Sequence, residues 1–248
     1  TSPVGMYPKS GASPLDLALF HCLEAVLDVV YNPLSTKLVL DAKDRGLPGV
    51  NGLEMLVAQA KQAVEHFLDT LIDDAVIDTL YKKIERERNN VILIGMPSAG
   101  KTTIGQSVAQ RCGKEFIDMD AYIVENCGKS IPQIFEESGE NGFRARESEA
   151  AIALAGRNGA VIATGGGIVK HKVNMDYLRQ NGIVFFIDRS LDKLITTDDN
   201  RPLSSSAQAV ARMYEERIEL YRKYADHIVD NNTTIDACAE RITEILNG

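Results

Sequence analysis

Eight consecutive residues, from Gly95 to Thr102, have types and a spacing that suit phosphate chemistry. Their sequence, GMPSAGKT, fits the pattern G-x-x-x-x-G-K-[ST] of a phosphate-binding loop. In such a loop, backbone N–H groups and the N-terminus of the following helix point at one spot, where a polyphosphate can bind. Lys101 would then reach the outer phosphates, and the hydroxyl of Thr102 would bind Mg²⁺. The alternative is a chance glycine-rich turn.

The residues on either side of this loop favour the phosphate-binding interpretation. Residues 91–94 (VILI) form a short apolar, β-rich run that predicts a buried strand, and residues 103–111 have helical spacing. A strand, a glycine-containing turn and a helix are the context that the motif requires. The sequence therefore predicts a nucleoside triphosphate site. Its ATP-binding residues are Gly95, Ser98, Ala99, Gly100, Lys101, Thr102 and Thr103.

Two carboxylates follow the helix. Asp118 and Asp120 are two residues apart at the end of a predicted extended segment, residues 116–120, so both side chains are expected to point the same way. If both carboxylates face a triphosphate, one would belong to the coordination shell of Mg²⁺ and the other would contact the hydroxyl group of a substrate. The alternative is a pair of solvated acids in a loop.

Three arginines are candidates to bind anionic substrate groups, because a guanidinium binds carboxylate or phosphate in a bidentate manner. Arg144 has Glu147 three residues later to orient it, and Arg201 lies in the polar, aperiodic segment 196–206, which suits a mobile lid. Arg222 lies on a long predicted helix. Taken singly, an arginine is more often part of a surface ion pair.

Strands and helices alternate from the phosphate loop to the end of the chain, which predicts an α/β fold with a parallel sheet and helices on both faces. Ligands of such sheets bind at the carboxyl ends of the strands. One predicted strand, residues 160–164, ends in Gly165-Gly166-Gly167. Glycine there lets backbone N–H groups approach an anion, although a triple glycine alone is usually only a turn.

Composition excludes several classes of partner. The 248 residues carry a net charge of −8, which argues against non-specific nucleic-acid binding. No apolar run approaches the roughly 20 residues of a membrane span, and no leader is recognised. The four cysteines lack metal-binding spacing, so reduced thiols and a cytoplasmic location are expected.

Taken together, the motifs of residues 88–248 closely resemble those of the shikimate kinases. The family pattern is a phosphate loop, D-x-D, F-R-x-x-E, G-G-G after a strand, R-P-L and L-Y-R. This chain has all six in order: Gly95 to Thr102, Asp118/Asp120, Phe143 to Glu147, Gly165 to Gly167, Arg201 to Leu203, and Leu220 to Arg222. The joint match is far more specific than any single motif.

The resemblance implies transfer of the γ-phosphoryl group of ATP to the 3-hydroxyl of shikimate, a step in aromatic amino acid (chorismate) biosynthesis, with Mg²⁺ as cofactor. It implies catalytic roles for Asp120 as the base, for Lys101 and for Arg201, which would close over the phosphates and so also bind ATP. Asp118 would support Mg²⁺ through water, beside Thr102. The substrate-binding residues would be Asp120, Arg144, Gly166, Gly167 and Arg222.

Two other functions stay open from the residues alone. One is another small-metabolite kinase of the same fold, such as a gluconate kinase, because gluconate is also a carboxylated polyol. The other is a degenerate kinase that serves as a nucleotide-binding or assembly module. The filled catalytic positions argue against the second.

Residues 1–86 are a separate segment, and residues 87–248 form the kinase domain. A charged predicted helix end at residues 81–90 marks the boundary. Residues 15–30 predict an amphipathic helix running into a short strand, and residues 38–42 and 55–71 predict further helices. On residue pattern alone this segment is a helical appendage.

The first segment resembles the C-terminal part of shikimate dehydrogenase, a Rossmann-type protein. The matching pieces are SPVGM from Ser2, DVVYNPL from Asp28 and GLEMLVAQA from Gly52. The resemblance implies that Tyr31 and Gln59 are vestigial residues facing shikimate. It also implies that the catalytic lysine–aspartate pair and the dinucleotide-binding turn belong upstream, so NADP is not expected to be usable by this chain.

The first residue is Thr1 rather than Met, which predicts a segment of a longer polypeptide. The parent would be a bifunctional dehydrogenase–kinase fusion, and its N-terminal dehydrogenase half would be the expected partner of this segment.

Overall fold

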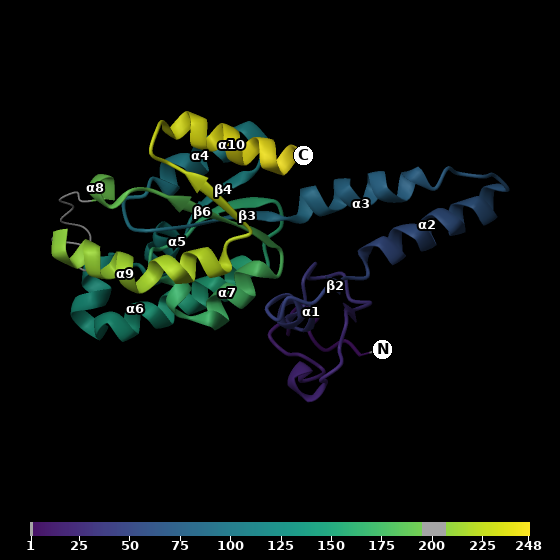
Figure 1. The fold of residues 1–248 in the computed structure, drawn as a ribbon, viewed down its shortest axis with the longest axis horizontal. Helices are drawn as coiled ribbons and strands as arrows, with labels where there is room; N and C mark the ends of the chain where they lie inside the picture. Colours follow the sequence, from purple (N-terminus) through teal and green to yellow (C-terminus); the bar gives the residue numbers. More distant parts are fainter. Residues whose placement is uncertain (1, 195–206) are drawn as a thin grey trace. The chain divides into compact units, whose positions relative to one another are not determined.

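The computed structural model describes residues 2–194 and 207–248. Its chain forms two compact units (Figure 1). The first comprises the residues up to Asn89 together with Arg179–Asn181, and the second comprises Asn90–Leu178 and Gly182–Gly248. The division thus falls three residues after the boundary predicted at residue 86. Each unit is described below by itself.

The second unit is built on a five-stranded parallel sheet with the strand order β4-β5-β3-β6-β7. Its strands are β3 (Asn90–Ile94), β4 (Glu115–Asp118), β5 (Ala160–Ala163), β6 (Gly182–Asp188) and β7 (His227–Asp230). Because every neighbouring pair is parallel, all five carboxyl ends lie at one edge. The phosphate loop, Asp118 and the three glycines each follow one of these ends, so the topology gathers them.

Helices cover both faces of this sheet. Figure 1 shows α4 and α10 on one side, and α6, α7 and α9 on the other. The bounds are α4 (Lys101–Cys112), α5 (Met119–Cys127), α6 (Ile131–Ala155), α7 (Lys172–Arg179), α8 (Leu191–Leu194), α9 (Ala207–Tyr224) and α10 (Ile235–Asn247), with a 3₁₀ turn η2 at Ile168–Lys170. The predicted alternation of strands and helices is confirmed.

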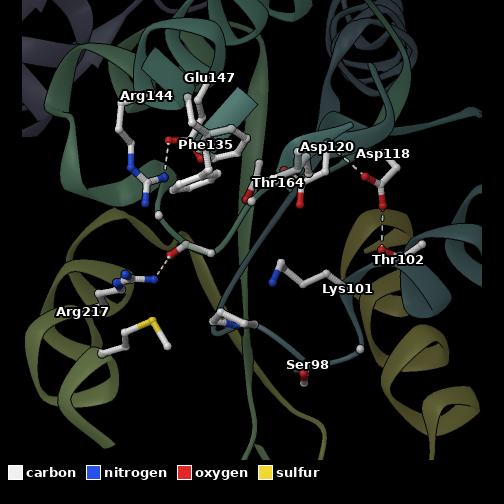
Figure 2. A pocket seen from close by; sticks show the side chains of 18 of the residues that line it. Ser98, Lys101, Thr102, Asp118, Asp120, Phe135, Arg144, Glu147, Thr164 and Arg217 are labelled. Carbon is white, nitrogen blue, oxygen red and sulfur yellow. Dashed lines mark hydrogen bonds and ion pairs between the residues drawn. The ribbon is translucent and has the colours of Figure 1, made fainter. Parts of the chain in front are cut away.

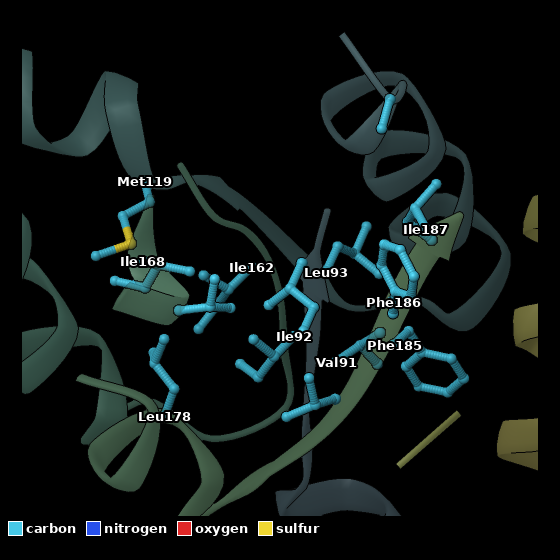
Figure 3. Close-up of a cluster of buried hydrophobic side chains, with 14 of the residues drawn as sticks. Val91, Ile92, Leu93, Met119, Ile162, Ile168, Leu178, Phe185, Phe186 and Ile187 are labelled. Atoms are coloured by element: carbon cyan, nitrogen blue, oxygen red, sulfur yellow. The ribbon is translucent and has the colours of Figure 1, made fainter. Parts of the chain in front are cut away.

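The core explains why the central strands are apolar on both faces. Residues 91–94 of β3 and 184–187 of β6 are fully buried, and Ile162 and Ile168 pack in the same cluster (Figure 3). A strand between two helical layers has no solvent-facing side, so it reads as a continuous apolar run. Burial of β3 and β6 holds the sheet in place, and the loops that follow these strands therefore leave it at the carboxyl edge.

Particular residues determine where helix α6 begins and where it bends. Ser130 and Gln133 form a reciprocal capping box at the N-terminus, with Pro132 in the first turn. Gly139 interrupts the helix with φ 65° and ψ −171°, a backbone conformation that glycine adopts at little cost. The second half of α6, after this break, presents Arg144 and Glu147 to the interior.

The first unit is small and partly irregular. It contains η1 (Leu17–Leu19), β1 (Val26–Leu27), α1 (Lys37–Lys43), β2 (Gly49–Val50), α2 (Leu53–Leu68) and α3 (Ala75–Arg88). β1 and β2 pair in parallel, and α1 lies between them in the chain. Helices α2 and α3 pack through a second apolar cluster that includes Leu53, Val57 and Tyr81.

Over residues 15–30 the predicted amphipathic helix is wrong, whereas the short strand expected at its end is present as β1. A single 3₁₀ turn forms instead, because the carboxylate of Asp16 accepts a hydrogen bond from the N–H of Ala18 and closes a local turn. Leu19 and Phe20 are 73% and 46% exposed. No apolar stripe is therefore buried here that would stabilise a longer helix. None of the helices described in either unit is long and apolar enough to span a membrane.

Candidate active site

A cavity of about 270 Å³ opens at the carboxyl edge of the sheet in the second unit. It is lined by the phosphate loop and the first turn of α4, by Asp118 and Asp120, by α6, by residues 164–167 and by α9 (Figure 2). Parallel strands therefore bring together residues from five separate parts of the chain.

The phosphate loop is held in shape by its own lysine. The ammonium group of Lys101, which is only 8% exposed, donates hydrogen bonds to the carbonyl oxygens of Gly95 (2.9 Å) and Met96 (2.8 Å). From outside the loop, the amide of Asn231 donates to the carbonyl of Ala99 at 2.8 Å. A Cβ on Gly95 would come within 2.7 Å of a backbone oxygen of β6, so only glycine fits there.

The predicted ATP-binding residues divide into two groups. Ser98, Gly100, Lys101, Thr102 and Thr103 line the cavity, whereas Gly95 and Ala99 shape the loop behind it. Ser98 has φ 64°, a left-handed conformation that is unfavourable for a residue with a side chain. The loop therefore adopts a glycine-like conformation at this position without having glycine.

Asp118 links the phosphate loop to helix α5. Its Oδ2 accepts a hydrogen bond from the Thr102 hydroxyl at 2.7 Å, and its Oδ1 accepts from the backbone N–H groups of Asp120 (3.0 Å) and Ala121 (3.2 Å). Asp118 is thus the N-cap of α5, a position that favours aspartate.

The expected geometry of the two aspartates needs correction. They do not alternate along one extended segment, because β4 ends at Asp118 and Asp120 already lies in the first turn of α5. The N-cap hydrogen bonds of Asp118 start a helix at Met119, where the extended segment was expected to continue to Asp120. Both carboxylates nevertheless line the cavity.

Arg144 and Glu147 form a buried ion pair on α6. Nη1 of Arg144 donates to Oε2 of Glu147 at 2.8 Å, and its Nε and Nη2 donate to Glu140 at 3.3 and 3.1 Å. Glu147 is fully buried. Burial raises the pKa of Glu147, and the nearby charge of Asp120 adds to this rise, while Arg144 opposes it.

Two of the three glycines, Gly165 and Gly167, are needed because charged groups pack against them, and Gly166 packs against Pro97. A Cβ on Gly165 would lie 2.9 Å from Oε1 of Glu147 and 3.0 Å from Oδ1 of Asp120. A Cβ on Gly167 would lie 2.1 Å from Nη1 of Arg144. The glycine run therefore lets two carboxylates and a guanidinium close around one stretch of backbone.

Arg217 of α9 is a buried cation of this cavity that the sequence patterns did not single out. It is 4% exposed and lines the cavity, and its Nη1 donates to the carbonyl oxygen of Gly166 at 3.2 Å. Its Nε is buried and has no hydrogen-bond partner in the part of the chain that the structure describes. Figure 2 shows Arg217 and Arg144 on the same side of the cavity, away from Thr102 and Asp118.

Arg222, which was expected to bind substrate, does not line this cavity. Its guanidinium is half exposed and binds Glu219, three residues earlier, at 2.8 Å. Met213, Arg217 and Tyr221 are spaced by four residues and share the buried face of α9, and Arg222 is rotated off that face. The sequence does contain a signal for Arg217, because this arginine lies at helical spacing between the apolar residues Met213 and Tyr221.

The remaining predicted residues lie elsewhere. Arg201 falls outside the described residues. Tyr31 and Gln59 belong to the first unit, and both are exposed. Among residues 2–194 and 207–248, no three His, Cys, Asp or Glu side chains are grouped so that they could hold a metal ion.

Comparison with known proteins places this cavity in a family. The family model described as shikimate kinase matches residues 97–247. The shikimate kinase of Clostridium botulinum is 43% identical over 162 residues, which cover 64% of this chain and 98% of that protein.

Solved structures agree with the sequence comparison. Shikimate kinase from Acinetobacter baumannii in complex with shikimate superposes with a TM-score of 0.64 at 34% identity, covering 67% of this chain and 97% of that one. Shikimate kinase from Aquifex aeolicus gives a TM-score of 0.58 at 30% identity and covers 64% and 96%, respectively.

Proposed function

The chain belongs to the shikimate kinase family, and from this premise we propose that it transfers the γ-phosphoryl group of ATP to the 3-hydroxyl of shikimate. One observation carries the proposal: a single cavity holds the phosphate loop at one end and two buried arginines at the other, with Asp120 lining the same space. That arrangement suits a polyphosphate donor and a carboxylated hydroxyl acceptor.

At the donor end, the backbone N–H groups of the loop and the N-terminus of α4 bind the phosphates. Lys101 exchanges its two carbonyl partners for phosphate oxygens. The paired Thr102 hydroxyl and Asp118 carboxylate, 2.7 Å apart, offer hard oxygen donors suited to Mg²⁺, with Asp118 acting through water. When bound, Mg²⁺ neutralises charge on the phosphates.

At the acceptor end, Arg144 and Arg217 bind the carboxylate of shikimate, in place of the pair Arg144 and Arg222 that the sequence suggested. Glu147 binds Nη1 of Arg144, whereas Nε and Nη2 are bound to Glu140 and are the nitrogens that a substrate carboxylate would take over. The backbone of Gly166 and Gly167 lies against the substrate.

The reaction needs little from the protein beyond positioning and charge neutralisation, because phosphoryl transfer passes through a loose transition state. The 3-hydroxyl oxygen bonds to the γ-phosphorus, the bond from that phosphorus to the bridging oxygen of ADP breaks, and Asp120 accepts the hydroxyl proton. The products are ADP and shikimate 3-phosphate. Arg201 is proposed to neutralise the phosphates, on the family resemblance alone.

The proposal is tested by measuring ADP release from ATP and Mg²⁺ by the purified chain. We expect release that depends on shikimate and not on gluconate, since the latter lacks the rigid ring that a preformed cavity can orient. Release of ADP with gluconate alone would leave the fold assignment intact and would identify the protein as a gluconate kinase instead. Binding of ATP with no release to either acceptor would favour a nucleotide-binding module.

We further propose that the first unit is the C-terminal fragment of a shikimate dehydrogenase domain from a dehydrogenase–kinase fusion. Its motifs around Tyr31 and Gln59 support this, as does the parallel strand–helix–strand unit of β1, α1 and β2, which is typical of Rossmann-type domains. Exposed apolar side chains, such as Leu27 (80%) and Phe67 (88%), suit a surface that the rest of such a domain would cover.

This fragment is expected to be inactive as a dehydrogenase, because neither the lysine–aspartate pair nor the dinucleotide-binding turn lies in residues 1–86. With NADPH and 3-dehydroshikimate, the absorbance of NADPH at about 340 nm should stay constant while shikimate-dependent ADP release proceeds in the same preparation. Measurable NADPH consumption by the pure chain would contradict the assignment of the missing residues.

A further inference from the structure

Arg144 is bound by two glutamates that differ in burial and in their relation to the cavity. Glu147 is fully buried, lines the cavity and accepts a hydrogen bond from Nη1 of Arg144 at 2.8 Å (Figure 2). The side chain of Glu140 is 44% exposed and does not line the cavity, although it binds the same guanidinium. Arg144 therefore has one enclosed carboxylate partner and one that is in contact with solvent.

The bond between Glu140 and Arg144 has a weak geometry. A single oxygen, Oε1 of Glu140, accepts from both Nε and Nη2 of Arg144, at 3.3 and 3.1 Å. A strong arginine–carboxylate pair instead has two parallel bonds of about 2.7–2.9 Å, with one oxygen for each nitrogen. A carboxylate that placed one oxygen on each of these nitrogens would therefore bind this edge of Arg144 better than Glu140 does.

The charges around the acceptor end of the cavity also favour an exchange. Three carboxylates meet two guanidinium groups there: Asp120, Glu140 and Glu147 against Arg144 and Arg217. The carboxylate of an acceptor would add a further negative charge in a region shielded from water, where like charges repel one another strongly. If Glu140 turns away into solvent as the acceptor binds, the balance of charge at this end stays the same.

The surroundings of Glu140 allow its side chain to leave Arg144. Gly139, the residue before it, interrupts α6, and a Cβ on Gly139 would have no atom within 4 Å. In the part of the chain that the structure describes, Arg144 is the one ion-pair partner of Glu140. Water can therefore hydrate the Glu140 carboxylate once it is displaced, while the bond to Glu147 keeps the guanidinium in place.

We propose that Glu140 is an internal competitor of the acceptor's carboxylate for Arg144, an inference that rests on the proposed kinase function. In the empty site Glu140 keeps the guanidinium oriented, and the acceptor displaces it on binding. Because the displacement costs part of the binding free energy, Glu140 weakens the site for every small carboxylate. It also speeds the release of the product, which keeps the carboxylate of the substrate.

The experiment is calorimetric titration of the full chain with shikimate and with its methyl ester, which carries no negative charge. For Glu140→Gln, which keeps the size of the side chain and removes its charge, we expect the Kd for shikimate to fall about five-fold, the upper range for a partly exposed ion pair. The Kd for the ester should stay within about two-fold. The matched control is Glu149→Gln, which removes an exposed glutamate of α6 that pairs with Arg146 and should change neither constant.

Three results would overturn the proposal. The first is a Kd for shikimate in Glu140→Gln that is within about two-fold of wild type or higher, because Glu140 would then have no effect or would support Arg144. The second is an equal gain for the ester, which would mean that the cavity had only loosened. The third is an equal gain in Glu149→Gln, which would indicate a long-range effect of net charge. If Glu140→Gln does not fold, Glu140→Ala decides by the same criteria.

Failure of the underlying kinase function gives a different result. Wild type would then bind no shikimate in the same titration, and the proposal would fall together with the kinase function. Wild type that binds shikimate no more weakly than Glu140→Gln would contradict the role of Glu140 alone.

Discussion

Asp120→Asn is expected to lower kcat for shikimate-dependent ADP release by about 10³-fold, because a positioned general base contributes roughly 10²- to 10⁴-fold. The amide keeps the shape of the side chain and its place in the first turn of α5, but it cannot accept the hydroxyl proton. Steady-state assays at saturating ATP and shikimate measure the effect.

The control for this variant is Asp236→Asn, an exposed acid on α10 that should leave kcat unchanged. ADP affinity should also survive in Asp120→Asn, because the phosphate loop is intact. A kcat near that of wild type would remove Asp120 from the role of base and leave catalysis to positioning and charge neutralisation.

Arg217→Ala is expected to raise the KM for shikimate by about 10- to 100-fold, the range of one charge-assisted hydrogen bond lost from a buried site. The KM for ATP should change little, since Arg217 lies on the acceptor side of the cavity. Initial rates with each substrate varied in turn separate the two constants.

Arg222→Ala is the matched comparison, because it removes the same side chain five residues later on the same helix. Its half-exposed ion pair with Glu219 predicts a KM for shikimate within about two-fold of wild type. The reverse ranking, with Arg222 the more sensitive position, would restore the assignment made from sequence and would mean that Arg217 only supports the backbone at Gly166.

Local patterns were sufficient for much of this fold. The strand at residues 91–94 and the phosphate loop depend on burial of a whole strand or on contacts within a few residues, and both were predicted. The pairing of Arg144 with Glu147 also followed from their separation of three residues on one helix.

Other features depend on how elements meet. Asp120 and Glu147 are 27 residues apart in sequence and on different helices, and only the folded chain brings both carboxylates against Gly165. Arg222 belongs to the L-Y-R motif of the family pattern and was therefore favoured by the sequence, whereas Arg217 is the arginine on the buried face of α9. The false helix at residues 15–30 shows the opposite error: Leu17 and Val26 pack against α1, but Leu19 and Phe20 stay exposed, so no continuous helical face is buried.

The two carbonyl oxygens that bind Lys101 reduce the free energy that an anion gains when it binds to the phosphate loop. The ammonium is nearly buried and donates two of its three N–H groups to carbonyl oxygens, so an anion that takes either of these N–H groups must first replace a hydrogen bond. A single weakly charged anion gains little from that exchange, whereas a triphosphate gains through several loop N–H groups at once. The two hydrogen bonds of Lys101 thereby favour a long polyphosphate over a small single anion at this site.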